Sequence, residues 1–105
     1  MTHEEVVAMI AETGLPNAYD HFAEGESPDP PFICFLYPRT DTFGADDVVY
    51  HQSPVLHIEV YTDYKDPEIE AAVEEILTAH ELFYSKSEVW IESEKLYEVL
   101  YEVSV

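Results

Sequence analysis

The sequence is poor in positive charge. Its 105 residues include four Lys and Arg against 23 Asp and Glu, a formal net charge of −19 at pH 7. Binding to a nucleic-acid backbone relies on clustered Lys and Arg that displace counterions, so this composition argues against unaided nucleic-acid binding. An anionic membrane surface is disfavoured for the same reason. Most carboxylates must therefore be solvated, and the fold must tolerate their mutual repulsion.

Cysteine and long apolar runs are also scarce. Cys34 is the only cysteine, so no intrachain disulfide can form and the cysteine content does not favour secretion. Residues 1–5 carry acids where a signal peptide carries Lys or Arg. The longest apolar run, residues 31–38, is far shorter than the roughly 20 residues that span a bilayer. These features predict a soluble protein of the reducing cytoplasm.

The length fits a single domain over residues 1–105, and 47% hydrophobic residues suffice for a core. Thr2 and Glu5 form a capping box ahead of an apolar stripe, and Gly14 ends the pattern, which predicts a helix over residues 3–13. Asp66 as N-cap and Pro67 at the first helical position open a second helix. Its apolar face is predicted to hold Ile69, Ala72, Val73, Ile76, Leu77 and His80, and its outward face Glu70, Glu74 and Glu81.

Four segments have strand patterns. Residues 32–37 are apolar on both faces, and residues 55–62 alternate, as do residues 88–92 and 97–103. The element order α-β-(β)-β-α-β-β predicts an α+β fold with two helices packed on one face of a mostly antiparallel four-stranded sheet. Residues 39–53 are predicted to form a long acidic loop with a brief edge strand at Val48, Val49 and Tyr50, and such loops are commonly functional.

Catalytic and metal-binding patterns are missing from the sequence. No HExxH, CxxC, calcium-loop, G-x-S-x-G or phosphate-loop spacing occurs. His57 and His80 are interpreted as structural histidines, and the thiol of Cys34 as a buried, inert group. The acids that precede the second helix are better explained as caps than as calcium ligands. We therefore expect no enzyme activity, no cofactor and no metal.

Two features favour an interaction role. The sheet face away from the helices is predicted to mix acids, among them Glu59, Glu88 and Glu102, with exposed rings, and it fits either an ordinary solvated face or a subunit contact. The loop at residues 39–52 fits either a disordered surface loop or a segment ordered by assembly. The predicted subunit or partner contacts are Arg39, Phe43, Asp46, Asp47, Tyr50, Tyr61, Trp90, Glu92 and Glu98.

The chain resembles small phage and prophage proteins of the head–tail gene cluster. The resemblance lies in residues 15–22 (LPNAYDHF), 43–50 (FGADDVVY), 58–66 (IEVYTDYKD) and 90–99 (WIESEKLYEV), and it spans the chain from about Leu15 onward. The chain is similar to tail-completion, or tail-terminator, proteins of phages with long non-contractile tails. That resemblance implies a structural virion protein that forms a ring, commonly a homo-hexamer, on the tail tube.

The resemblance further implies what such a ring contacts. Its partners would be other copies of the chain, the tail-tube protein and the head connector proteins, with DNA passing through the ring. The protein would be assembled in the host cytoplasm and reside at the head–tail junction of the virion. Two alternatives remain open from the residues. One is an acidic DNA mimic that inhibits a host nucleic-acid-binding protein, and the other is a cation-dependent binding module.

Overall fold

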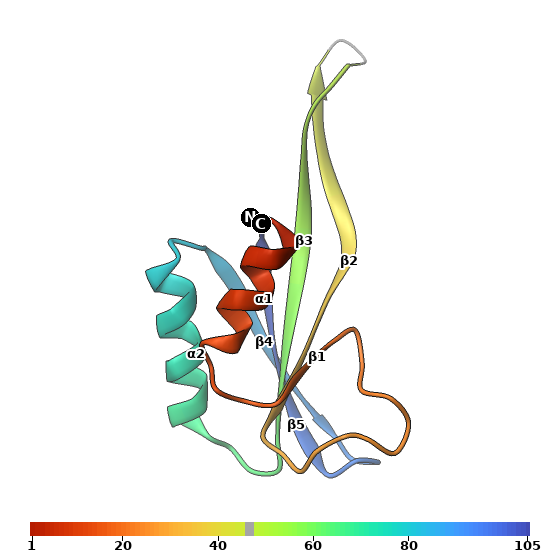
Figure 1. Cartoon of the computed structure of the whole chain (residues 1–105), viewed down its shortest axis with the longest axis vertical. Coiled ribbons are helices and arrows are strands. Elements are labelled where there is room, and N and C mark those ends of the chain that lie inside the picture. Colours follow the sequence, from red (N-terminus) through yellow and green to blue (C-terminus); the bar gives the residue numbers. More distant parts are fainter. Residues whose placement is uncertain (46–47) are drawn as a thin grey trace.

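The computed structural model describes residues 1–45 and 48–105, without the side chains of residues 43–51. The elements, in order, are α1 (His3–Ala11), β1 (Asn17–Tyr19), β2 (Phe32–Ala45), β3 (Val48–Thr62), α2 (Pro67–Ala79), β4 (Tyr84–Ile91) and β5 (Leu96–Ser104) (Figure 1). The predicted α+β class is confirmed. Among the described residues, no helix combines the length and apolar character needed to cross a bilayer.

The sheet has five strands in the order β1-β2-β3-β5-β4. The prediction of four mostly antiparallel strands is therefore wrong in detail, because β1 adds a fifth strand that runs parallel to β2. This strand is only three residues long, and prolines and a glycine surround it, so it shows no periodicity in the sequence. Two hydrogen bonds extend its pairing: Ile33 N donates to Pro16 O over 2.9 Å, and Asp20 N donates to Phe35 O over 2.7 Å.

Both helices begin where their caps predict. The Thr2 hydroxyl accepts from Glu5 N over 3.1 Å and Glu5 Oε1 accepts from Thr2 N over 2.9 Å, which completes the capping box of α1. Asp66 Oδ1 accepts from Ile69 N over 3.2 Å at the start of α2. Helix α1 ends at Ala11, two residues earlier than predicted.

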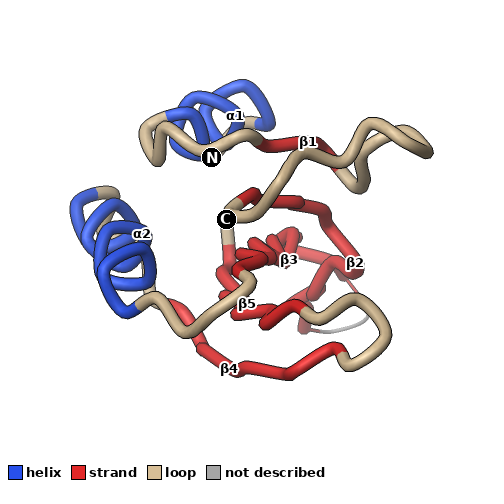
Figure 2. Tube along the Cα trace, turned by 90° about the horizontal axis from the view of Figure 1, so that it is seen from below, coloured by secondary structure: helices blue, strands red, loops and turns tan. Residues whose placement is uncertain are grey.

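One hydrophobic core joins the two helices to a single face of the sheet. Figure 2 shows α1 and α2 on the same side of the strands. Burial of these side chains supplies the main stabilisation of a domain of this size. The core consists of Val6, Met9 and Ile10 from α1, Val73 and Leu77 from α2, and Ile33, Phe35, Leu56, Ile58, Val60, Val99, Tyr101 and Val103 from β2, β3 and β5.

The acids of α2 do not all face solvent, contrary to the prediction. Glu70 is only 8% exposed, and its carboxylate lies 3.0 Å from Lys65 Nζ and 2.8 Å from Lys86 Nζ. Burial raises the pKa of Glu70, but hydrogen bonds from both lysines outweigh it and hold the pKa below its usual value. Glu74 also faces the sheet, where it accepts from Lys86 over 2.7 Å and from the Tyr101 hydroxyl over 2.7 Å. Helix α2 is thus fixed to the sheet by ion pairs as well as by apolar contacts.

We predict that Lys86→Met destabilises the protein by about 1–2 kcal/mol, because it removes a cation from the buried carboxylate of Glu70 and from Glu74. The control is Lys95→Met, which removes the exposed pair with Glu92 in the turn after β4 and should leave the stability almost unchanged. Urea unfolding followed by circular dichroism measures both effects. Equal losses in the two variants would contradict a special role for the α2 ion pairs.

Candidate functional site

Strands β2 and β3 continue beyond the body of the domain as a two-stranded arm (Figure 1). We call residues 39–45 and 48–54 the arm. They pair antiparallel with each other, from Thr40 opposite Pro54 to Ala45 opposite Val48. The last residue of β3 that pairs with β5 is Val55, and the last residue of β2 that pairs with β1 is Phe35. Among the described residues, both outer edges of the arm therefore have no neighbouring strand.

The prediction of a loop at residues 39–53 is wrong, because these residues extend two strands. The short strand predicted at residues 48–50 does exist, but it belongs to the 15-residue strand β3. The arm is hard to recognise in sequence because its residues do not alternate between apolar and polar types. Phe43 and Tyr50 lie in its strands, with side chains outside the description, and Asp46 and Asp47 lie outside the described residues.

Arg39 fixes the root of the arm. A register shift between Leu36 and Arg39 interrupts the β2–β3 ladder where the arm leaves the body. Arg39 Nη2 donates to Glu102 Oε1 over 2.6 Å, and His57 Nε2 lies 3.2 Å from Glu102 Oε2. A hydrogen bond from Arg39 is the main reason that the pKa of Glu102 lies below its usual value. The Glu102 carboxylate therefore links β2, β3 and β5 at the point from which the arm projects.

The residues predicted as contacts on the outer face of the sheet do not all lie on that face. Tyr61 and Glu98 are paired residues of β3 and β5 on the face away from the helices, as predicted. Trp90 instead pairs with Tyr97, at a ring-centroid distance of 4.8 Å, and its alternation with Lys86 places it on the helix side. Glu92 lies in the turn after β4, where its carboxylate accepts from Trp90 Nε1 over 2.6 Å.

The predicted sheet face is wrong for Trp90 and Glu92, because β4 is an edge strand, and their role as contacts stays a prediction. Its six central residues are all exposed, so hydrophobicity does not distinguish one face from the other. Even Val89, an apolar residue on the face opposite Trp90, is 52% exposed. Glu88, predicted on the outer face, instead forms an ion pair with Lys65 in the segment ahead of α2.

The segment of residues 20–31 partly covers the outer face of the sheet. Phe22 contacts Phe32 edge to face at 5.5 Å between ring centroids, and Phe32 stacks on Tyr61 at 5.0 Å. A pocket of about 270 Å³ lies between this segment and the strands. It is lined by Asp20, His21, Phe22, Ser27, Phe32, Cys34, Glu59, Tyr61, Ile91, Glu94 and Leu96.

Glu59 is the most perturbed carboxyl of this pocket. Burial, followed by the nearby carboxylate of Glu98, raises the pKa of Glu59 to about 7. Burial also raises the pKa of the Cys34 thiol to about 11, so the reactive thiolate is scarce at neutral pH. The sequence predicts Glu59 on this face but does not predict its raised pKa. The proximity of Glu59 to Glu98 depends on the strand register, which the sequence does not show.

The Glu59 carboxyl can hold a proton near neutral pH, and the same pocket is lined by Asp20 and His21, whose Oδ2 and Nδ1 atoms lie 2.6 Å apart. The metal-ligating side chains of the described residues are not gathered into a site. Among them, no group of three or more His, Cys, Asp or Glu side chains is arranged to hold a metal ion. His57 is bonded to Glu102, and His80 Nε2 lies 2.7 Å from Glu12 Oε2, which links α2 to α1. His57 thus occupies a structural position, as the sequence predicts, whereas His80 is exposed at the C-cap of α2 and does not lie on the apolar face of the helix.

The chain was compared with protein-family models and with curated protein sequences. No protein-family model matches the chain, and no curated protein matches it in sequence.

We predict that Glu59→Gln makes stability less dependent on pH. The pKa of Glu59 in the folded chain is above that of an ordinary carboxyl, so its contribution to stability is complete below pH 4.5 and is lost as pH rises through 7. The variant should match the wild type at pH 4.5 and exceed it by about 1–2 kcal/mol at pH 8.5, allowing for the solvent that reaches a half-buried carboxyl.

Urea unfolding at several pH values tests this expectation. Glu94→Gln removes a charge from the same pocket without removing the buried carboxyl, so it is the matched control. Parallel pH profiles for Glu59→Gln and the wild type would show that Glu59 does not hold a proton near neutral pH.

Proposed function

We propose that this chain is a structural phage or prophage protein that caps the tail tube as a ring and joins it to the head connector. The observation that carries the proposal is the arm. An isolated two-stranded hairpin is marginally stable in water, and its unpaired backbone groups are available to pair with another chain. At about 3.3 Å per residue, its seven-residue strands reach roughly 20 Å beyond the body. A projection of that length is suited to contact a neighbouring subunit.

The arm favours a ring over a symmetric dimer. The arm of one copy and the body surface that receives it are different surfaces, so the contact is head-to-tail. Such contacts generate closed rings when the rotation between neighbours closes. The resemblance to tail-terminator proteins makes six the proposed number of subunits. The ion pair between Arg39 and Glu102 supports this role, since it holds the arm at a defined angle to its own body.

The charge of the chain also supports passage of DNA through such a ring. Each Lys and Arg is already paired with acids: Arg39 with Asp41 and Glu102, Lys65 with Glu70 and Glu88, Lys86 with Glu70 and Glu74, and Lys95 with Glu92. Six copies at −19 each carry −114, so the ring has little with which to hold phosphates. Repulsion between copies opposes assembly in dilute solution, and salt reduces it.

The alternative, an acidic mimic of DNA, loses its main structural support. The row of carboxylates proposed to imitate phosphates was Glu70, Glu74 and Glu81 on the outer face of α2. The first two face the sheet and are neutralised by lysines. The described residues of α2 therefore do not display that row to a basic cleft.

We predict that replacing residues 40–53 by a two-residue turn leaves the body folded but abolishes rings. The body retains Arg39, Pro54 and the whole core, so its circular dichroism should remain that of a folded α+β domain. Negative-stain electron microscopy of concentrated protein at high salt should show rings for the wild type and none for the shortened chain. Glu94→Gln, outside the arm, should form rings normally. Rings of unchanged shape from the shortened chain would contradict the assembly role of the arm.

Removal of the gene from a phage that encodes this chain tests the biological role. The expected particles are full heads without attached tails and tails of abnormal length, because the tube end is neither capped nor joined. Expression of the intact chain in trans should restore infectious particles, and the shortened chain should not. Normal-length tails joined to full heads in the absence of the gene would refute the proposal.

A further inference from the structure

The turn between α2 and β4 exposes a phenylalanine almost completely. Phe83 is 96% exposed, the largest fraction among the large apolar side chains that the structure describes, with Tyr64 next at 63%. An exposed phenylalanine does not gain the favourable free energy that comes from moving its ring out of water. Aromatic side chains in such positions are typical anchors of protein interfaces.

The position of Phe83 is set by a tight helix ending and not by a loose loop. Glu81 N donates to Thr78 O over 2.9 Å and Leu82 N donates to Leu77 O over 3.0 Å, which is the hydrogen-bond pattern of a Schellman motif. Glu81 occupies the left-handed position of that motif, with φ of 59°. Leu82 then packs against the core, so the next residue, Phe83, is directed to solvent. The ring is thus presented on a rigid support.

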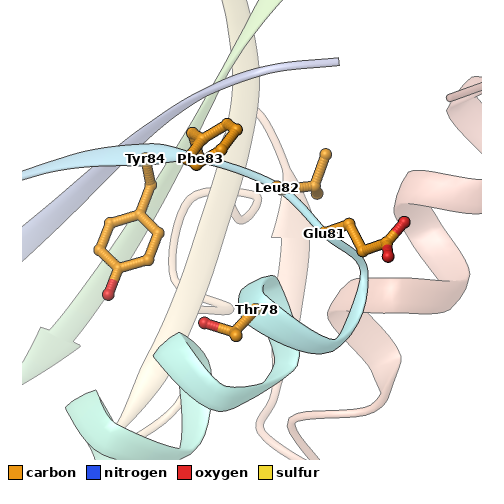
Figure 3. Close-up of a pocket in the computed structure, with 5 residues that line it drawn as sticks. All are labelled: Thr78, Glu81, Leu82, Phe83 and Tyr84. Atoms are coloured by element: carbon orange, nitrogen blue, oxygen red, sulfur yellow. The ribbon is translucent and has the colours of Figure 1, made fainter.

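Phe83 lies between two hollows in the surface. The first, of about 400 Å³, is lined by Thr78, Glu81, Leu82, Phe83 and Tyr84. Figure 3 shows its residues, with Thr78 at the end of α2 and the others along the chain that leads into β4. The second, of about 240 Å³, is lined by Phe83, Tyr84, Ser85, Glu102 and Ser104. We call Phe83 and these two hollows the Phe83 ridge.

The charges beside the Phe83 ridge define what can bind it. Glu81 lines the first hollow and Glu102 the second. The carboxylate of Glu102 is already bound to Arg39 and His57, whereas that of Glu81 has no ion-pair partner among the described residues. All four Lys and Arg side chains already form ion pairs, with Arg39 bound to Glu102, so no cation of the chain lies against Glu81. Another copy would bring further negative charge to the surface. Charge complementarity therefore favours a basic partner over a second copy.

We propose that the Phe83 ridge is a docking surface for a partner protein, specifically for a segment in which an apolar side chain is flanked by Lys or Arg. The apolar side chain would enter the first hollow against the Phe83 ring, and a flanking cation would lie near Glu81. The second hollow adjoins the root of the arm, where Glu102 binds Arg39, but Phe83 and Glu81 lie outside the arm, so this proposal does not depend on arm-mediated ring assembly.

A synthetic peptide that contains one leucine and one phenylalanine flanked by lysines tests the proposal. Titrated into the ¹⁵N-labelled full chain, it should shift the amide signals of residues 78–85 and 102–104. Phe83→Ala should weaken its binding tenfold or more, because the anchor is removed. That variant should fold normally, since the ring contributes little to the core. Tyr64→Ala, which removes another exposed ring, is the matched control and should bind as the wild type does.

Two further titrations test the role of charge. Glu81→Gln should weaken binding several-fold, and the same peptide with glutamates in place of lysines should not bind. Equal affinity of Phe83→Ala and Tyr64→Ala would mean that lysines are attracted to the acidic surface in general, and would overturn the proposal. Binding of the glutamate peptide, or no binding of the lysine peptide at millimolar concentration, would overturn it as well.

A second copy as the occupant is tested by sedimentation of the wild type and of Phe83→Ala at equal concentrations. Self-association that disappears in Phe83→Ala would assign the Phe83 ridge to another copy and refute the basic partner. The shortened chain without its arm separates the two proposals, because it should still bind the lysine peptide. Failure of the peptide titration with intact ring assembly would overturn only the docking surface.

Discussion

The structure depends on where four cations are placed among 23 acids. Lys65 and Lys86 lie between α2 and the sheet, where they compensate the buried carboxylate of Glu70. Arg39 lies at the root of the arm and reaches across to β5. Each of these side chains lies at a junction between two elements of the fold. Most other described carboxylates face solvent, where their repulsion is weakened by water and salt, and half-buried Glu59 is the exception.

The sequence predicts the helices well because their signals are local. Thr2 with Glu5 and Asp66 with Pro67 specify helix starts through contacts within one turn, and the structure contains both caps. The strands that bury one face were likewise predictable from alternation. The elements that depend on strand pairing were not predictable, because β1 is too short to show a period and the residues of the arm do not alternate between apolar and polar types. The sequence shows neither the register of the sheet nor the orientation of an edge strand.

In the candidate site, too, the sequence placed residues correctly only where a strand has one buried face. Tyr61 and Glu98 were placed correctly because β3 and β5 each have one buried face, which leaves the other outward. Trp90 was misplaced because β4 is exposed on both faces. Phe83 was not selected at all, since a phenylalanine next to a predicted helix end resembles a core residue. Only the Schellman motif, which points Leu82 inward and Phe83 outward, distinguishes the two.

The position of Cys34 has a consequence for the durability of a particle built from this chain. Its side chain is buried beneath the segment of residues 20–31, and its thiol is held in the protonated form. In a virion that leaves the reducing cytoplasm, each subunit of the proposed ring would carry one such thiol into an oxidising medium. Because thiolate is the reactive species, these thiols would neither cross-link neighbouring subunits nor react readily with small oxidants. The ring would keep its non-covalent contacts outside the cell.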